Sequence, residues 1–267
     1  YKVATLSRGY KRDTRGFVLA DQNSSAQSIG DEPFQFYKKF SPDIKVAVDA
    51  NRQNGIRHLM QEQIEPDVIL LDDAYQHRQV TPGLNILLSA YDRLYTQDWI
   101  LPTGDLREPR SGAKRADIIV ITKCPEKLSK PVKERIIKRI NPLDHQEVFF
   151  SSINYSDQVY SNDGSIDLSS LNSFTLVTGI ANAKPLLNFL KNSGLNFDHI
   201  EFKDHHSFTE KDIKALSEKP LVITTEKDYV RLFYHRELHN KLYYLPITLE
   251  IDRKETFDNL IRNFVKT

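Results

Sequence analysis

Two adjacent acids, Asp72 and Asp73, follow an apolar run at residues 68–71 and are the side chains most suited to metal chemistry. When a buried strand ends in carboxylates, they lie at the carboxyl edge of a parallel sheet, where α/β proteins bind ligands. Such a pair suits Mg²⁺, which one or two carboxylates hold together with water and substrate phosphates. Gln76 and His77 follow directly and favour this interpretation. The alternative is that the two acids only cap a turn or the next helix.

A second acidic group lies in residues 30–33 (GDEP), where Pro33 and the acids around it predict the first turn of a helix. Favourable interaction with the positive end of the helix dipole is by itself enough to explain acids at this position. The functional alternative makes Asp31 a general base, because a carboxylate within hydrogen-bond reach of a hydroxyl nucleophile can take its proton.

Basic residues gather in residues 7–12 (SRGYKR) and residues 107–115 (REPRSGAKR), and Arg52 follows a predicted strand. Guanidinium groups bind phosphate oxygens through two parallel hydrogen bonds, so each stretch is a candidate site for a phosphorylated substrate. A solvated charged face is the alternative. The first stretch follows a strand edge and the second adjoins a turn-rich loop, and both positions favour a functional role.

Two histidines, His205 and His206, lie between a predicted strand and a predicted helix in the second half of the chain. Adjacent residues seldom point at one ion, so a metal site is disfavoured there. A proton shuttle, or a group that orients a distant carboxylate, is the better functional role for one of them. Further on, residues 224–228 (TTEKD) predict a capping box before a helix, with a phosphate contact from Lys227 as the alternative.

These residues are carried by short apolar runs that alternate with amphipathic segments, a pattern that predicts βα units and a mostly parallel sheet. In the first half we expect strands at 2–7, 44–48, 68–71, 84–88, 118–121 and 146–157, and helices at 51–63 and 132–140. After a turn at 161–164 we expect strands at 174–178, 197–202, 221–224 and 242–250, and helices at 184–192, 209–218, 228–237 and 254–266. The expected domains are residues 1–145, a β-hairpin linker at 146–172, and a smaller α/β domain at 173–267.

The composition excludes several classes of protein. Among the 267 residues, 37 are Lys or Arg and 36 are Asp or Glu, so the net charge of +1 gives no field that favours nucleic acid. The single cysteine, Cys124, excludes an intrachain disulfide framework and a zinc site built from several cysteines, and fits a reducing, cytoplasmic setting. No uninterrupted apolar run approaches the roughly 20 residues that cross a bilayer.

Taken together and in order, the motifs resemble the tetraacyldisaccharide 4′-kinases, the lipid A 4′-kinases of Gram-negative outer-membrane synthesis. The matching stretches are residues 7–12 (SRGYKR), 30–33 (GDEP), 72–78 (DDAYQHR), 101–109 (LPTGDLREP), 115–117 (RAD), 204–205 (DH) and 225–228 (TEKD). They extend over most of the chain and are far more specific jointly than singly. Ala74 and Tyr75 depart mildly from the residues usual in the family between the acids and Gln-His.

The resemblance implies a lipid kinase that transfers the γ-phosphoryl group of ATP to the 4′-hydroxyl of tetraacyldisaccharide 1-phosphate, giving lipid IV A, with Mg²⁺ as the metal. It implies an α/β fold in which a P-loop-NTPase-like, mostly parallel sheet is followed by a smaller α/β domain joined by a β linker. It also implies a peripheral protein on the cytoplasmic face of the bacterial inner membrane.

The resemblance further assigns roles to individual residues. Asp31 is then the base that takes the hydroxyl proton, with His205 from the second expected domain supporting it. The acids implied at the metal are Asp72, Asp73 and Glu32. The residues implied to contact the nucleotide or phosphates are Gln76, Arg52, Arg107 and Tyr10. This set of base, acids and arginines is what phosphoryl transfer needs, because that reaction depends mainly on positioning and charge stabilisation.

One family feature is absent from these residues. The family is built on a P-loop, G-x-x-x-x-G-K-[ST], and none of the ten glycines begins this pattern. Because the chain begins inside a predicted strand, we expect the P-loop, its strand and helix, and an apolar segment that docks on the membrane to lie upstream of Tyr1. Residues 1–145 would then be a partial P-loop domain, and the 267 residues alone are expected to bind ATP poorly and to turn over little.

Two other functions remain open on sequence. One is a non-catalytic module that binds a phosphoglycolipid or another anion through its arginine-rich stretches. The other is a different P-loop kinase that acts on a soluble substrate. A nucleic-acid partner is disfavoured, because the charge is balanced and no platform of aromatic and basic residues is found.

Overall fold

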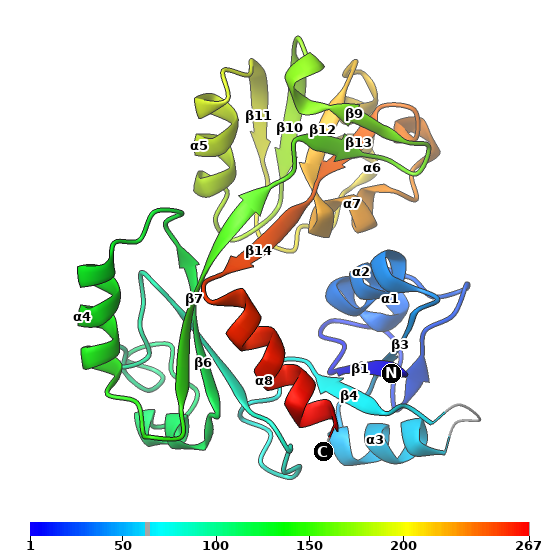
Figure 1. Ribbon diagram of the computed structural model, residues 1–267. Helices are drawn as coiled ribbons and strands as arrows, with labels where there is room; N and C mark the ends of the chain where they lie inside the picture. The colour runs from blue at the N-terminus through cyan, green and yellow to red at the C-terminus, as the bar shows by residue number, and fades with distance from the viewer. Residues whose placement is uncertain (62–64, 267) are drawn as a thin grey trace. The chain divides into compact units, whose positions relative to one another are not determined.

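The computed structural model describes residues 1–61 and 65–266, which pack into two compact units (Figure 1). Unit 1 combines residues 1–70 with residues 155–247, and unit 2 combines residues 71–154 with residues 248–267. This grouping differs from the expected domains because the C-terminal strand and helix pack with the middle of the chain. The expected limits at 145 and 172 follow chain order and stay a prediction. Among the described helices, none is both long and apolar enough to span a bilayer.

The first sheet of unit 1 has the strand order β2-β3-β1-β4. Its strands are β1 (Val3–Ser7), β2 (Val18–Leu19), β3 (Ile44–Val48) and β4 (Val68–Leu71), and its helices are α1 (Ala26–Ile29), α2 (Asp31–Phe40) and α3 (Arg52–Met60). Strands β1 and β3 are parallel, and Leu6 of β1, Val48 of β3 and Leu59 of α3 are fully buried. The expected strands at 44–48 and 68–71 are confirmed, whereas α1 and β2 were not expected. The helix expected at 51–63 spans Arg52–Met60, and Gln63 lies outside the described residues.

The second sheet of unit 1 has the strand order β11-β10-β12-β13-β8-β9. Strands β10 to β13 are parallel, and β8 runs antiparallel to both β13 and β9. The strands are β8 (Gln158–Tyr160), β9 (Ser165–Asp167), β10 (Phe174–Thr178), β11 (Phe197–Glu201), β12 (Val222–Thr225) and β13 (Leu242–Leu245). The helices are α5 (Lys184–Asn192), α6 (Glu210–Ser217) and α7 (Glu226–Leu232), with short 3₁₀ turns η2 (Leu168–Ser170) and η3 (Arg236–Leu238). The expected hairpin is confirmed by β8, β9 and the turn between them.

Unit 2 holds one four-stranded sheet with the order β14-β7-β6-β5. Its strands are β5 (Ile86–Ala90), β6 (Ile118–Cys124), β7 (Glu147–Tyr155) and β14 (Ile247–Ile251), its helices are α4 (Lys130–Ile140) and α8 (Lys254–Lys266), and a 3₁₀ helix η1 (Arg110–Arg115) precedes β6. Helix α4 packs on one face through Ile136 and Ile140, and α8 covers the other through Phe257 and Ile261. The sheet therefore has a hydrophobic core on each face.

Two strands that the sequence predicts as continuous are each divided. The strand expected at 146–157 is β7 followed by β8, and the strand expected at 242–250 is β13 followed by β14, with Pro246 between them. Proline has no backbone N–H to donate to a ladder, which favours a break at that position. In both cases the two parts pair in different sheets.

The strand expected at 84–88 is also shifted, to Ile86–Ala90, where it pairs with β6 from Ile118 onward. The helix expected at 228–237 begins earlier, at Glu226, because Thr225 caps it by accepting from the Asp228 N–H. It ends at Leu232, before the 3₁₀ turn η3.

Helices α2 and α7 pack directly against each other within unit 1. Buried Phe34 of α2 and Val230 of α7 share one hydrophobic cluster, and the Phe34 ring stacks 6.0 Å from the ring of Tyr234. At the other end of the contact, Lys39 Nζ lies 2.8 Å from Glu226 Oε1. This contact brings the first turn of α2 next to α7, although the two helices are far apart in the sequence.

The loop between β11 and α6 is held by a compact polar anchor. His206 Nε2 lies 3.0 Å from Asp212 Oδ2, and the His206 ring stacks 4.6 Å from the ring of Phe202. Thr209 caps α6, and its N–H and hydroxyl both donate to the same Asp212 oxygen. The hydrogen bond from His206, followed by those from Thr209, lowers the pKa of Asp212 to about 2.

Asp212→Asn is expected to destabilise the protein at pH 5 by about 1 kcal/mol, since solvent screens hydrogen-bonded charges near the surface. The folded pKa lies below that of an unfolded carboxyl, so the ionised form stabilises the fold above about pH 4 and this contribution is lost as the pH falls towards 2. Urea unfolding at pH 5 and pH 3 measures both effects. Asp198→Asn, on the exposed side of β11, is the matched control. The stabilising role of ionised Asp212 would be contradicted if both variants lost the same free energy of unfolding. It would also be contradicted if the difference in unfolding free energy between Asp212→Asn and the parent were as large at pH 3 as at pH 5.

Candidate functional site

Asp31 is the first residue of α2, and the residue before it sets its position. Gly30 has φ +96, a conformation that side chains disfavour, and a Cβ there would lie 3.2 Å from the carbonyl oxygen of Tyr10. Glycine thus lets the chain turn sharply into α2 against residues 9–10. Asp31 therefore lies in the first turn of α2, at the positive end of the helix dipole.

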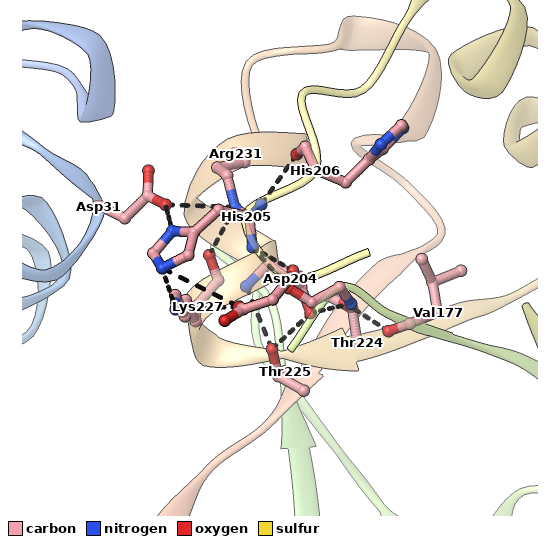
Figure 2. Close-up of polar contacts among 11 residues, drawn as sticks. Asp31, Val177, Asp204, His205, His206, Thr224, Thr225, Lys227 and Arg231 are labelled. Carbon is pink, nitrogen blue, oxygen red and sulfur yellow. Dashed lines mark hydrogen bonds and ion pairs between the residues drawn. The ribbon is translucent and has the colours of Figure 1, made fainter. Parts of the chain in front are cut away.

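His205 meets Asp31 from a loop 174 residues further along the chain. Its Nδ1 lies 3.2 Å from Asp31 Oδ2, and both side chains are about one-quarter exposed or less (Figure 2). His205 has φ 58, which is uncommon for a residue with a β-carbon, and its N–H donates to the Gly179 carbonyl at 3.2 Å. Such backbone strain gathers at functional sites, where the surrounding structure holds it in place.

Helix α7 contributes two cations to the same place. Lys227 Nζ lies 3.0 Å from His205 Nε2 and 3.4 Å from Asp204 Oδ1. One helical turn later, Arg231 Nε lies 3.6 Å from Asp31 Oδ2. Figure 2 shows both cations reaching the pair from α7. The cluster therefore alternates acidic and basic side chains, from Asp204 through Lys227 and His205 to Asp31 and Arg231.

The other expected residues of unit 1 lie at different depths. Tyr10 is 68% exposed, and its ring meets the ring of His205 edge-on at 6.1 Å. Glu32 is exposed beside Asp31. Arg52 is only 3% exposed, and its Nη1 donates to the carbonyl oxygen of Asp49 at 2.7 Å. The structure thus places Tyr10 at the Asp31 site, whereas Arg52 points into the fold.

The remaining expected residues belong to unit 2. Asp72 and Asp73 directly follow β4, and Asp73 has φ 42. Arg107 Nη1 lies 3.2 Å from Asp73 Oδ2, but both side chains are more than 60% exposed, so this ion pair contributes little to stability. Gln76 is exposed nearby in the chain. The structure confirms the expected position of the acids after a strand and brings Arg107 to them.

Glu108 anchors the loop that carries Arg107. Its carboxylate lies 3.0 Å from both Arg78 and Arg115. Burial opposes ionisation of Glu108, but the hydrogen bonds from Arg115 and Arg78 outweigh it and lower its pKa. Arg115 also donates to the Tyr75 carbonyl at 3.0 Å, which ties the loop to the segment after Asp73.

The donor chemistry of Asp72 and Asp73 suits Mg²⁺, which prefers carboxylate oxygens and completes its shell with water and phosphate. Within residues 1–61 and 65–266, no group of three or more His, Cys, Asp or Glu side chains is arranged to hold a metal ion. Mg²⁺ does not require such a group, because one or two carboxylates are enough when the substrate carries phosphates.

Sequence reasoning missed the roles of Lys227, Asp228 and Arg231. Asp228 is fully buried and accepts from the Gly179 N–H at 2.8 Å, from the Thr225 hydroxyl at 2.8 Å, and from Arg231. The available signal was the spacing of Lys227 and Arg231, which puts two cations on one face of a short helix. Their partners depend on tertiary contacts that no local pattern reveals.

The motifs and the fold agree with what comparison to known proteins finds. The model of the Tetraacyldisaccharide-1-P 4′-kinase family matches residues 1–266. The chain is 49% identical to the tetraacyldisaccharide 4′-kinase of Flavobacterium johnsoniae, over 100% of this chain and 79% of that protein. It is 43% identical to the tetraacyldisaccharide 4′-kinase of Bacteroides thetaiotaomicron, over 100% of this chain and 77% of that protein.

A solved structure supports the same assignment. The crystal structure of the "apo" form of LpxK from Aquifex aeolicus in complex with ATP is similar with a TM-score of 0.74 and 25% identity, covering 99% of this chain and 79% of that one. The mixed α/β architecture with mainly parallel strands, expected from the sequence, is therefore confirmed as that of a P-loop kinase fold. On the combined evidence of motifs, fold and relatives, the chain belongs to the tetraacyldisaccharide-1-P 4′-kinase family, a family of lipid kinases.

Proposed function

We propose that this protein transfers the γ-phosphoryl group of ATP to the 4′-hydroxyl of tetraacyldisaccharide 1-phosphate, giving lipid IV A. Family membership supports the reaction, and the pairing of Asp31 with His205 is the observation in the structure that carries it. A carboxylate with a supporting histidine is suited to accept a hydroxyl proton as the oxygen attacks phosphorus. The A. aeolicus structure with ATP supports the choice of phosphoryl donor.

The proposed roles divide between proton transfer and charge stabilisation. Asp31 takes the proton of the acceptor hydroxyl, and His205 supports that carboxylate. Asp72 and Asp73 would hold Mg²⁺, which would supply charge neutralisation at the phosphates. Arg107 would steady phosphate oxygens, because a guanidinium matches them with two donors. Gln76 and Tyr10, whose side chains are exposed, are the proposed contacts to the nucleotide or phosphates.

The acceptor sets where the reaction takes place. Four acyl chains hold the glycolipid in a bilayer, whereas its sugar hydroxyl and ATP are in water. We therefore propose that the protein works as a peripheral protein at the cytoplasmic face of the inner membrane.

Asp31→Asn in the complete gene product is expected to lower kcat by about 10²- to 10⁴-fold, because the amide cannot accept the hydroxyl proton. Transfer of ³²P from labelled ATP to tetraacyldisaccharide 1-phosphate in detergent micelles measures this loss. Asp198→Asn, an exposed acid of the same unit, should keep full activity.

Arg107→Ala should lower kcat/KM by about 10- to 100-fold in the same assay, through lost stabilisation of phosphate charge. Arg139→Ala, at an exposed arginine of α4 in the same unit, is its matched control. If Asp31→Asn stayed fully active while Arg107→Ala abolished function, the protein would be an anion-binding module and the kinase proposal would be wrong.

The 267 residues by themselves are expected to bind ATP weakly and to show little transfer, because they contain no G-x-x-x-x-G-K-[ST] pattern. Titration calorimetry with ATP and Mg²⁺, together with the transfer assay, tests this expectation. Robust ATP-dependent transfer by residues 1–267 would overturn it. Sequencing the coding DNA directly upstream of the Tyr1 codon shows whether the gene encodes the pattern in frame.

A further inference from the structure

Two cations of α7, Lys227 and Arg231, contact the Asp31–His205 pair: Lys227 at His205 Nε2 and Arg231 at Asp31 Oδ2. We propose that Lys227 fixes His205 as the neutral tautomer with its proton on Nδ1, and that Arg231 fixes Oδ2 of Asp31. Both are then positioning residues that direct Asp31 Oδ1 towards the acceptor hydroxyl. This inference rests on the proposed kinase function for its catalytic consequence, but its structural part does not.

The tautomer follows from which groups can donate. A lysine ammonium has donors and no acceptor, so its contact of 3.0 Å with His205 Nε2 requires that nitrogen to accept. A neutral imidazole carries one proton, which must then be on Nδ1. Nδ1 lies 3.2 Å from Asp31 Oδ2, a hydrogen-bonding distance to a carboxylate. The hydrogen bonds therefore form one chain, in which Lys227 donates to His205 and His205 donates to Asp31.

Asp204 holds Lys227 in this chain. Its Oδ1 lies 3.4 Å from Lys227 Nζ, so the ammonium lies between a carboxylate and the imidazole (Figure 2). The Lys227 side chain is only 22% exposed, which limits its access to other partners. The residue that sequence analysis offered as a phosphate contact is thus engaged with the histidine.

Arg231 is held still more firmly. Its side chain is 10% exposed, Nη1 donates to the His206 carbonyl at 2.8 Å, and Nη2 donates to the Gly179 carbonyl and to buried Asp228. Nε also donates to the Lys227 carbonyl at 3.4 Å. Together these contacts fix the plane of the guanidinium and hold its charge beside Asp31, with Nε 3.6 Å from Oδ2 as an ion pair. A lysine could carry the same charge but not the same fork of donors.

The two contacts converge on one oxygen of the base. His205 and Arg231 both reach Oδ2, and Figure 2 shows the second Asp31 oxygen pointing away from the network. As the acceptor oxygen forms its bond to the γ-phosphorus and the bond from phosphorus to ADP breaks, the hydroxyl proton moves to Asp31 Oδ1 and ADP leaves. His205 takes no proton in this step, because Lys227 occupies Nε2 and Nδ1 already carries one.

The first test is direct. Long-range ¹H–¹⁵N spectra of the 267-residue protein, labelled at histidine, report which ring nitrogen of His205 is protonated, whether or not the protein turns over. We expect the Nδ1–H pattern in the parent and a mixture of tautomers in Lys227→Met. Lys211→Met, which removes an exposed lysine of α6, should leave the spectrum unchanged. An Nε2–H pattern in the parent, or an unchanged tautomer in Lys227→Met, would overturn the proposal.

The second test measures catalysis in the complete gene product. Lys227→Met and Arg231→Lys should each lower kcat by about 10- to 100-fold with little change in KM for ATP, since misplacing a catalytic group costs rate rather than binding. Lys227→Arg, which keeps a donor, should recover part of kcat. Arg236→Lys, at an exposed arginine after α7, is the control and should match the parent. A raised KM with unchanged kcat would assign Lys227 to phosphate binding and overturn the positioning role.

A variant that changes neither cation separates positioning from simple loss of charge. Gly179→Ala would place a Cβ 2.9 Å from Asp228 Oδ1 and push the Asp228–Arg231 pair out of place. Gly179→Ala should reduce kcat as Arg231→Lys does. A ¹⁵N–¹H spectrum checks that the variant is folded. Full activity in a folded Gly179→Ala would contradict the positioning role of Arg231. If the parent shows the Nδ1–H tautomer but no lipid phosphorylation, the proposed function fails and the tautomer assignment stands.

Discussion

The contact between α2 and α7 is the constraint on which the candidate site depends. Asp31 and His205 are 174 residues apart, and they meet because Phe34 and Val230 bury a shared apolar surface beneath them. Burying side chains of this size contributes about 1.5–3 kcal/mol each, which is far more than a partly exposed hydrogen bond between Asp31 and His205 supplies. Hydrophobic packing of α2 against α7 therefore determines where Asp31 and His205 lie, and their hydrogen bond forms as a consequence.

Beside the Asp31–His205 pair lies the ion pair of Asp228 and Arg231, and such pairs are costly to bury. Asp228 and Arg231 are removed from water, yet the Asp228 carboxylate also accepts from a backbone N–H and a hydroxyl, so its charge is well compensated. A buried pair of this kind adds little net stability, but removing one partner leaves an uncompensated charge. This ion pair orients the Arg231 guanidinium beside Asp31.

Local patterns in the sequence predicted much of the scaffold. The strands at 44–48, 68–71 and 174–178 and the helices at 184–192 and 254–266 agree with the structure to the residue, because apolar runs and helical periodicity are local signals. The long strands at 146–157 and 242–250 were wrong, because each spans a change of sheet that pattern alone does not show.

The site was predictable in part for a similar reason. The motifs indicated Asp31 and His205, and the structure brings them together. The capping role of Thr225 was also visible from residues 225–228. The partner of Lys227 was not, because its contact with His205 depends on how α7 packs beside a distant loop. The assignments of Asp72, Asp73, Glu32 and Gln76 to metal and nucleotide stay predictions.

The left-handed backbone at His205 has a consequence for how this protein can evolve. At φ 58, glycine or asparagine is more comfortable than histidine, so the backbone alone favours replacing the residue. Selection for stability and selection for the contact of His205 with Asp31 then act in opposite directions on this residue. Replacing His205 with glycine or asparagine is then expected to relieve this backbone strain and to remove the contact with Asp31.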